Sequence, residues 1–274
     1  MRTSLTSFRI GMVKLRSYNK YYGQQGGIIT MKILLISDIH GNLEALINVL
    51  YNNQNVDKII VLGDIIGYMP NPNECIQLVK DYDCILGNHE YAILNPARLD
   101  YFNPYAKEAL LWTKEQLTNG NISFLEQLPF KIDYPEFNFT VAHGSIGIDP
   151  FEYIEEVRQA GTEFELMDTD ILFIGHTHVP KVFIMDKKEN SIETLDIIGY
   201  DIPISIDKNK KYIFNIGSVG QPRDRNPDSC YAIYNTIEKT VEYKRQPYNT
   251  NVTVRKIIEN GLPRFLYERI IIGR

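Results

Sequence analysis

The feature that most constrains this fold is a set of short polar motifs, most of which close an apolar run. All five histidines of the chain lie in these motifs. The motifs are Ser37-Asp38-Ile39-His40, Gly63-Asp64, Gly87-Asn88-His89-Glu90, Ala142-His143-Gly144 and Gly175-His176-Thr177-His178. Imidazole, carboxylate and carboxamide groups are ligands of divalent transition metals. Histidines scattered through a core would not all lie beside Asp, Asn and Gly, so the pattern predicts a metal centre.

The first part of the sequence predicts strands that alternate with helices. Apolar runs at 32–36, 58–62 and 83–86 are separated by helical spacing of apolar residues at 43–50 and 72–79. This order is typical of parallel β-α-β units, whose ligands bind at the carboxyl ends of the strands. The side chains expected along that rim are Asp38, His40, Asp64, Asn88 and His89.

The middle of the sequence predicts a helical segment and two more strands. Residues 101–127 are expected to be helical, with Trp112 as a core residue rather than a cofactor contact. Strands at 137–141 and 171–174 lead directly into the motifs of His143 and His176. These two motifs are therefore expected to close strands as the earlier ones do.

The last part of the sequence predicts a change of pattern. From Val182 to Tyr243, short β segments separated by polar turns indicate a second, largely antiparallel sheet. The tail after Asn251 is expected to be helical, with a break at 261–263. An exposed strand within 181–214 could pair with a second copy of the chain, so a homo-oligomer is left open.

Length and charge limit the domain organisation and the partners. We find no internal repeat and no linker among the 274 residues, so a single domain from 31 to 274 is the simplest interpretation. Residues 1–30 contain no acidic residue and lack the apolar core of a secretory signal. We expect them to be a flexible extension or the result of a start assigned too early; a transit peptide is the alternative. The net charge of −5 argues against bulk nucleic-acid binding.

Cysteine usage and hydropathy predict a cytoplasmic protein with no membrane association. The three cysteines, Cys75, Cys84 and Cys230, cannot all pair, and none belongs to a Cys-x-x-Cys motif. We expect free thiols in a reducing compartment. The sequence has no run of the roughly 18 apolar residues that a membrane span requires.

The ordered motifs resemble those of the calcineurin-like metallophosphoesterase superfamily. The shared order is Asp38-x-His40, Gly63-Asp64, Gly87-Asn88-His89-Glu90, His143-Gly144 and Gly175-His176-x-His178. The resemblance covers nearly the whole chain from Met31. The flanking segments 63–75 and 215–223 are similar to those of the small prokaryotic phosphodiesterase-type members. The resemblance implies an α/β fold with two packed mixed β-sheets flanked by helices, a four-layer α/β-β/α sandwich.

The resemblance also implies a centre of two divalent metal ions and assigns a role to each motif residue. Asp38, His40 and His178 would hold one metal ion. Asn88, His143 and His176 would hold the other, and Asp64 would bridge the two. His89 would be the acid beside the leaving oxygen. Manganese is the favoured metal, while Fe, Zn and Ni accept the same ligands.

Two departures from the superfamily pattern narrow the substrate. The protein phosphatases carry Asp-Arg-Gly after the bridging Asp and an Arg before Gly-Asn-His, whereas this chain has Ile66-Gly67-Tyr68 and Leu86. A phosphoprotein substrate and a close dinucleoside tetraphosphatase are therefore less favoured. Ile216 stands where near relatives have proline, in a loop where Asn215 and Arg223 are candidate substrate contacts.

The sequence thus predicts a metal-dependent hydrolase of phosphate esters. A phosphodiesterase acting on small esters or nucleotides is the leading hypothesis. A phosphomonoesterase or a diadenosine-type pyrophosphohydrolase is the alternative, because the metal ions read the phosphate and not the leaving group. A non-catalytic scaffold on the same fold is the alternative of another class, and the intact ligand positions and His89 argue against it.

Overall fold

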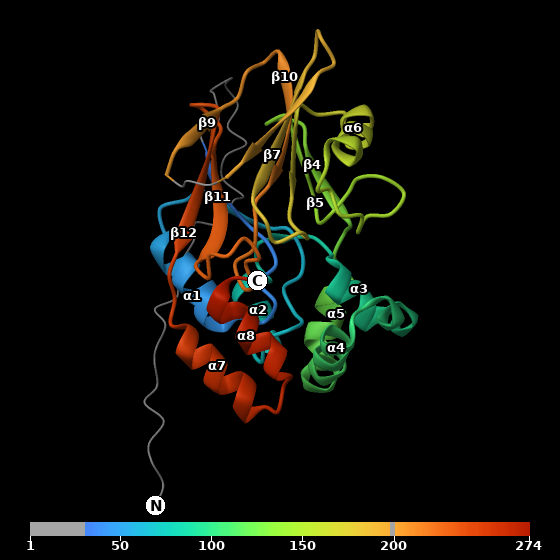
Figure 1. Cartoon of the computed structure of the whole chain (residues 1–274), viewed down its shortest axis with the longest axis vertical. Coiled ribbons are helices and arrows are strands. Elements are labelled where there is room, and N and C mark those ends of the chain that lie inside the picture. Colours follow the sequence, from blue (N-terminus) through green and yellow to red (C-terminus); the bar gives the residue numbers. More distant parts are fainter. Residues whose placement is uncertain (1–30, 198–200) are drawn as a thin grey trace, which may run out of the picture.

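The structure is a computed structural model that describes residues 31–197 and 201–274. The expectation for residues 1–30 lies outside these described ranges. Twelve strands form two six-stranded sheets, which stand side by side with helices packed beyond them (Figure 1). Both sheets mix parallel and antiparallel pairs, so the expected class of two packed mixed sheets with flanking helices is confirmed.

The first sheet carries the β-α-β units expected from the apolar runs. Its strands, in spatial order, are β3 (Asp83–Cys84), β2 (Lys58–Val61), β1 (Lys32–Ile36), β11 (Ser229–Asn235), β12 (Thr240–Gln246) and β9 (Pro203–Ser205). Strands β1, β2 and β3 are parallel, with Leu34 opposite Ile59. Strand β11 joins the other side of β1 antiparallel, with Leu34 opposite Ile233.

The second sheet carries the remaining histidine motifs. Its strands, in spatial order, are β4 (Lys131–Tyr134), β5 (Phe139–Ala142), β6 (Ile171–Ile174), β10 (Lys210–Asn215), β7 (Lys181–Asp186) and β8 (Ile192–Asp196). Strands β5, β6 and β10 run parallel, and the other neighbours are antiparallel. The prediction that 182–243 would form a separate antiparallel sheet is wrong, because these strands divide between both sheets.

The helices form the outer layers. They are α1 (Leu43–Asn52), α2 (Pro72–Val79), α3 (Asn88–Leu94), the 3₁₀ helix η1 (Pro96–Tyr101), α4 (Pro104–Gln116), α5 (Asn119–Leu125), α6 (Val157–Leu166), α7 (Thr250–Glu259) and α8 (Arg264–Ile272). The expected helix over 101–127 is interrupted, because Leu117 is extended and Thr118 caps α5 through its side chain. The expected break in the C-terminal tail separates α7 from α8.

The apolar residues occupy three layers of core. Alternate residues of β1 and β2, such as Ile33, Leu35 and Ile60, face Phe139, Phe173 and Phe214 of the other sheet. The opposite residues of the same strands pack under α1 and α2, and α6 covers the far side of the second sheet. Burial of both faces explains why these strands are continuous apolar runs.

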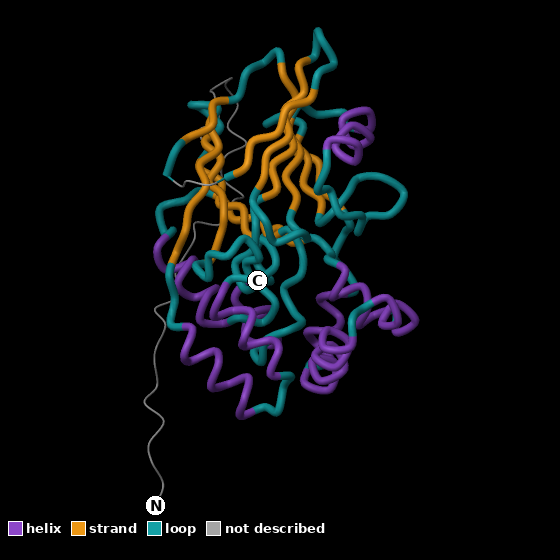
Figure 2. Tube along the Cα trace, viewed as in Figure 1, coloured by secondary structure: helices purple, strands orange, loops and turns teal. Residues whose placement is uncertain are grey.

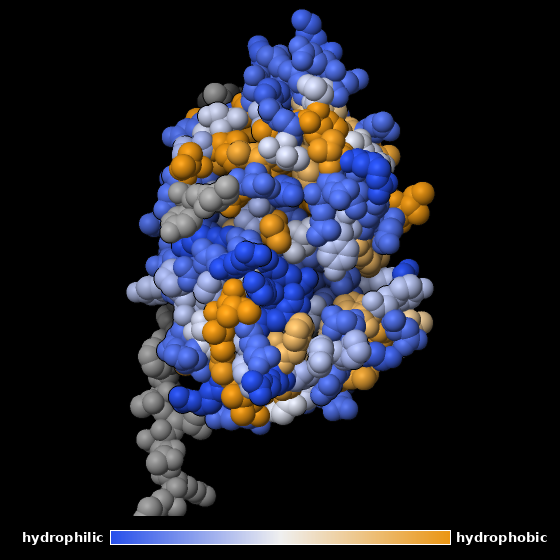
Figure 3. Space-filling view, in the orientation of Figure 1, coloured by the Kyte–Doolittle hydropathy of each residue, from blue (hydrophilic) through white to orange (hydrophobic). Residues whose placement is uncertain are grey.

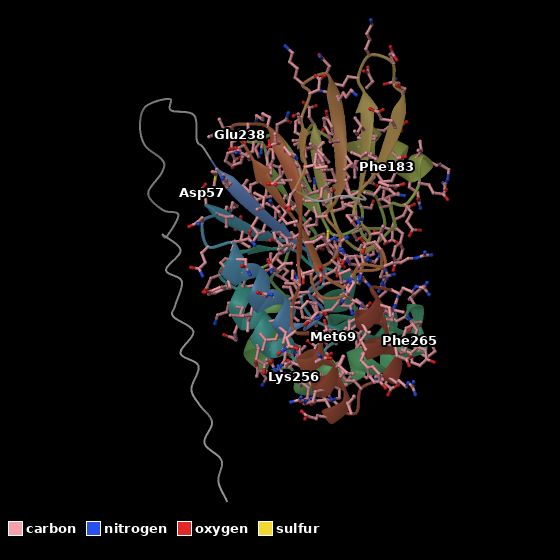
Figure 4. The ribbon with its side chains drawn as sticks, turned by 60° about the vertical axis from the view of Figure 1, so that its left-hand side comes forward. Asp57, Met69, Phe183, Glu238, Lys256 and Phe265 are labelled. Carbon is pink, nitrogen blue, oxygen red and sulfur yellow. The ribbon has the colours of Figure 1, made fainter. Side chains whose placement is uncertain are left out.

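The loops at the carboxyl ends of the parallel strands lie between the strands and the lower helices (Figure 2). Figure 4 shows Met69, which follows β2, near Lys256 of α7 at the helical end, whereas Phe183 and Glu238 lie toward the sheet end. A further cluster of Met69, Leu266, Ile270 and neighbours holds α7 and α8 against this loop region. The C-terminal helices therefore become part of its wall.

Candidate metal centre and active site

The polar motifs converge into two groups of potential metal ligands that share one residue. Asp38, His40, Asp64 and His178 form one group, and Asp64, His143 and His176 form the other. Within each group the candidate ligand atoms lie within 4.8 Å of one another, and all of these side chains are buried. The carboxamide oxygen of Asn88 lies 3.1 Å from His143 Nε2, at the edge of the second group.

In the first group, ring nitrogens and carboxylate oxygens point toward the same point. His178 Nε2 lies 3.2 Å from Asp38 Oδ1 and 3.0 Å from His40 Nε2. His40 Nε2 lies 3.6 Å from Asp64 Oδ2. Asp38 Oδ1 is buried and has no hydrogen-bond partner. A cation placed among Asp38, His40, His178 and the shared carboxylate of Asp64 would fit this arrangement.

In the second group, the same carboxylate oxygen faces another pair of imidazoles. His143 Nε2 lies 3.4 Å from Asp64 Oδ2 and 3.1 Å from His176 Nδ1. Asp64 Oδ2 thus stands within 3.6 Å of a histidine nitrogen from each group. A carboxylate with this position can contact a cation on either side.

Backbone carbonyl oxygens fix the tautomers of three histidines, whose remaining nitrogen lone pairs point into the site. The Nδ1 atoms of His40, His143 and His178 face the carbonyl oxygens of Ile66, Leu62 and Gln221 at 3.2, 2.7 and 2.6 Å. A carbonyl only accepts, so each Nδ1 must donate, and each neutral ring then presents an Nε2 lone pair. Backbone carbonyls commonly orient metal-binding histidines in this way. The centre is therefore a set of acceptors that a cation would satisfy.

The charges around the site agree with this donor set. Burial alone would raise the pKa of Asp64, but His143 and His89 hold it well below its usual range. Burial would lower the pKa of His143, but the carboxylates of Asp64 and Asp38 raise it to about 10. The same carboxylates that attract a proton to His143 would attract a metal cation in its place.

The backbone at these motifs adopts a conformation that the sequence does not reveal. Asp38, His40, Asp64, His176 and His178 all have positive φ angles, between 51° and 67°. A left-handed residue other than glycine costs roughly 1–2 kcal/mol, and such strain concentrates at functional sites. In an extended strand, residues two positions apart point the same way. Asp38 and His40 do converge, but through left-handed turns.

The Glu90 side chain holds these turns by hydrogen bonds to the backbone. Glu90 does not bond the His89 ring, and it is not a solvated residue at a helix start. The carboxylate is fully buried and accepts hydrogen bonds from the backbone N–H groups of Asp64, Ile66 and Gly87, at 2.8, 3.0 and 2.9 Å. Burial, with the nearby charge of Asp64, raises the pKa of Glu90 to about 7.

We expect Glu90→Gln to weaken metal binding and lower Tm. The amide would turn an NH₂ group toward backbone donors and leave at least one buried N–H unsatisfied, which costs about 1–3 kcal/mol. Calorimetric melting with and without Mn²⁺, together with titration of bound metal, measures both effects. The matched control is Glu74→Gln, an exposed first-turn glutamate of α2, which should melt like the wild type. Unchanged Tm and metal affinity in Glu90→Gln would contradict the bracing role.

His89 lies beside the two groups without belonging to either. Its Nε2 is 3.8 Å from Asp64 Oδ2, and its Nδ1 is buried with no hydrogen-bond partner. The ring packs edge-on against Phe102 at 5.0 Å and against Tyr68 at 4.7 Å. Gly67 makes room for it, because a Cβ there would lie 2.2 Å from Nδ1, and its φ is +116°. Burial lowers the pKa of His89 to about 4.

The two candidate substrate contacts have different positions. Asn215 is buried, and its side chain bonds the carbonyl of Gly175, the hydroxyl of Thr177 and the N–H of Gly217. Asn215 therefore supports the loop of His176, and it is not among the residues that line the cavity. Arg223, in contrast, lines the cavity above the two ligand groups.

That cavity has a volume of about 260 Å³, and its walls include residues that motif reading missed. They share aromatic or cationic side chains and are Tyr91, Arg98, Tyr101, Phe151, Tyr153 and Arg269. Tyr153 packs on His176 with ring centroids 3.9 Å apart. These residues come from α3, η1, the loop between β5 and α6, and α8, where no local pattern marks a residue as facing a cavity. The expected buried, unpaired state of the three cysteines is confirmed.

The chain is similar to known proteins over most of its length. The family model described as the calcineurin-like phosphoesterase superfamily domain matches residues 31–239. The uncharacterized protein MJ0912 of Methanocaldococcus jannaschii is 38% identical over 259 residues, which cover 90% of this chain and all of that protein. A metallophosphoesterase from Sphaerobacter thermophilus is 37% identical with a TM-score of 0.79, over 90% of this chain and all of that one.

A more distant relative shares only part of its length with the chain. It is the symmetrical bis(5'-nucleosyl)-tetraphosphatase of Psychromonas ingrahamii, 24% identical over 142 residues. The match covers 49% of this chain and 51% of that protein.

Proposed function

We propose that this chain, which belongs to the calcineurin-like phosphoesterase superfamily, is a phosphodiesterase that uses two divalent metal ions to hydrolyse small phosphodiesters or nucleotides. The observation that carries the proposal is the shared carboxylate. Asp64 Oδ2 faces His40 on one side and His143 on the other, among imidazoles whose lone pairs converge. Two cations would satisfy these acceptors, and a single cation would leave one group unsatisfied.

The proposed ligands are Asp38, His40 and His178 for one ion and Asn88, His143 and His176 for the other, with Asp64 between them. When bound, divalent ions lower the pKa of a water and offset charge on phosphate oxygens. Mn²⁺ is the proposed metal, since nitrogen and oxygen ligands without a thiolate suit it.

His89 is the proposed proton donor. Its ring lies next to Asp64 and opens into the cavity, where an ester oxygen could reach it. Hydrolysis forms a bond from a water oxygen to phosphorus and breaks the bond to the leaving oxygen. That leaving oxygen needs a proton, and a buried imidazole that becomes charged when an anionic substrate binds can supply it.

A diadenosine-type pyrophosphohydrolase is the second candidate. It is supported by the partial similarity to the symmetrical bis(5'-nucleosyl)-tetraphosphatase and by the arginines around the cavity. A phosphomonoesterase would use the same ligands. A metal-stabilised scaffold would bind the ions and turn over no ester.

The test is a metal add-back with two esters. Protein stripped with chelator should be inactive, and Mn²⁺ should restore turnover of bis(p-nitrophenyl) phosphate above that of p-nitrophenyl phosphate. A higher rate on the monoester would favour the phosphomonoesterase. Bound Mn²⁺ without turnover of either ester would reject the enzyme and leave the scaffold.

Location and assembly follow as lesser proposals. Three buried free thiols suit a cytoplasmic protein, which is the location we propose. In the described part of the chain, no helix has the length and apolar character to cross a bilayer. Strand β8 forms an edge of the second sheet and carries exposed residues, so pairing with a second copy there is the proposed route to a homo-oligomer.

A further inference from the structure

Two arginines of the cavity wall stand together, and neither has an Asp or Glu partner among the described residues. Arg223 follows β10 in sequence, and Arg269 lies on α8, beyond the residues that the family model matches. Among the residues that the structure describes, no Asp or Glu side chain forms an ion pair with either arginine. The nearest acidic neighbours in sequence are engaged elsewhere, because Asp224 pairs with Arg245 and Glu268 with Arg264.

Arg223 is held next to the proposed metal ligands. Its backbone N–H donates to the carbonyl of His178 at 3.1 Å. Its Nη2 donates to the hydroxyl of Tyr68 at 3.2 Å and to the Gln221 side chain at 3.0 Å, while its Nε is buried with no hydrogen-bond partner. The Tyr68 ring in turn packs 4.5 Å from His40. The guanidinium is therefore positioned by neutral groups.

Arg269 is held beside it by the end of the chain. Its guanidinium lies 5.1 Å from the ring centroid of Phe265, and its Nε donates to the main-chain oxygen of Arg274. Gly273 closes α8 with a φ of 65°, and its carbonyl accepts a bond from Arg225 N–H at 2.7 Å. A Cβ on Gly273 would lie 2.6 Å from the backbone of Asn226. Only glycine lets the chain end dock so closely on the loop of Arg223.

The surface around this contact is strongly hydrophilic. Figure 3 has the orientation of Figure 1. Hydrophilic side chains gather there at the place where Figure 1 marks the C-terminus, beside a hydrophobic strip over α8. Figure 4 shows Phe265 on the helical side of the molecule. Two partly buried cations repel, and each loses water, so burial and Arg223 both lower the pKa of Arg269. An anion between them would relieve both costs.

Asp64, Asn88 and His176 line the same cavity as the two arginines. If the proposed metal ions hold one phosphoryl group, an anion between the arginines would be a second one. Exposed rings along the same wall, among them Tyr101 with Arg98 at 5.5 Å, offer a stacking surface for a nucleobase.

We propose that Arg223 and Arg269 form a subsite for a second phosphoryl group, so that the substrate is a nucleotide carrying at least two linked phosphoryl groups. This inference rests on the proposed function, because it assumes that one phosphoryl group occupies the metal centre. It assigns the C-terminal helix α8 a role in substrate selection.

The test compares binding of AMP and α,β-methylene-ADP to the Mn²⁺-loaded protein by calorimetry at fixed free Mn²⁺. The wild type should bind the diphosphate analogue more tightly. Charge-assisted hydrogen bonds are worth about 1.5–3 kcal/mol, so Arg269→Gln should reduce this preference by about tenfold to hundredfold. Arg269→Lys should keep part of it, since a lysine retains charge but not the two-pronged geometry.

The matched control is Arg264→Gln, an exposed arginine on the same helix that pairs with Glu268. It should keep the wild-type preference for the diphosphate. An equal preference in Arg269→Gln and wild type, or no preference in the wild type, would overturn the subsite. Binding does not require turnover, so a preference without any ester hydrolysis would reject the proposed function and leave the subsite standing.

Discussion

Replacing His89 with alanine should lower kcat for an unactivated phosphodiester by about 10²–10⁴ while both metal ions stay bound, as expected for loss of a general acid. His89 lies outside both ligand groups, and its Nε2 is 3.8 Å from Asp64. Removing it should therefore spare metal binding. The measurement is kcat for a dinucleoside phosphate, with metal content determined on the same sample.

The leaving group separates acid catalysis from simple disruption. A p-nitrophenolate departs without a proton, whereas an alkoxide needs one, so the loss should be much smaller for bis(p-nitrophenyl) phosphate. Phe102→Leu is the packing control, because the Phe102 ring lies 5.0 Å from the His89 ring and has no acidic proton to donate. It should not change the dependence on leaving group. An equal loss on both substrates, or full activity in His89→Ala, would contradict the acid role.

The convergence of the first motifs could be predicted because it requires only that the apolar strands be buried and lie parallel. Apolar runs such as 32–36 and 58–62 must be buried, and parallel strands place their carboxyl ends at one edge. His40 and Asp64 then come together whatever the remaining strands do. Asp38, His40, Asp64 and Asn88 were placed on one rim in this way, and the resemblance of the motifs implied the rest of both ligand groups.

The assignment of later strands could not be predicted from local pattern. Strand β11 pairs with β1, and β10 pairs with β6, although both lie in one continuous β-rich stretch of sequence. Alternation shows that a segment is a strand, but its partner depends on packing between distant residues. The break between α4 and α5 has the same origin, since propensity favours continuing the helix and Thr118 caps a new one.

The wall of the site depends on backbone and burial, which the sequence encodes only indirectly. Glu90 looks like an ordinary first-turn glutamate, yet it is fully buried under three backbone N–H groups. Arg269 lies on a helix whose sequence neighbours, such as Arg264, are exposed and charged. The structure, in which Gly273 docks against Asn226, shows that Arg269 and not Arg264 lines the cavity.

Asp64→Asn should have the largest effect on the metal centre. The carboxamide has one acceptor oxygen and no charge, so it cannot serve both His40 and His143 sides as a carboxylate does. Both metal sites should weaken together. Because loss of even a group that only orients a ligand typically costs about 10–100-fold in metal affinity, we expect at least about that loss at each site.

Asp38→Asn is the matched control, since Asp38 belongs only to the group with His40 and His178. It should weaken one metal site and leave the other close to wild type. Both variants are compared by titrating Mn²⁺ into chelator-stripped protein and counting bound ions. If Asp64→Asn lost one ion and held the other at wild-type affinity, Asp64 would belong to a single metal site. The two ligand groups would then be independent, and the proposal of a shared centre would fall.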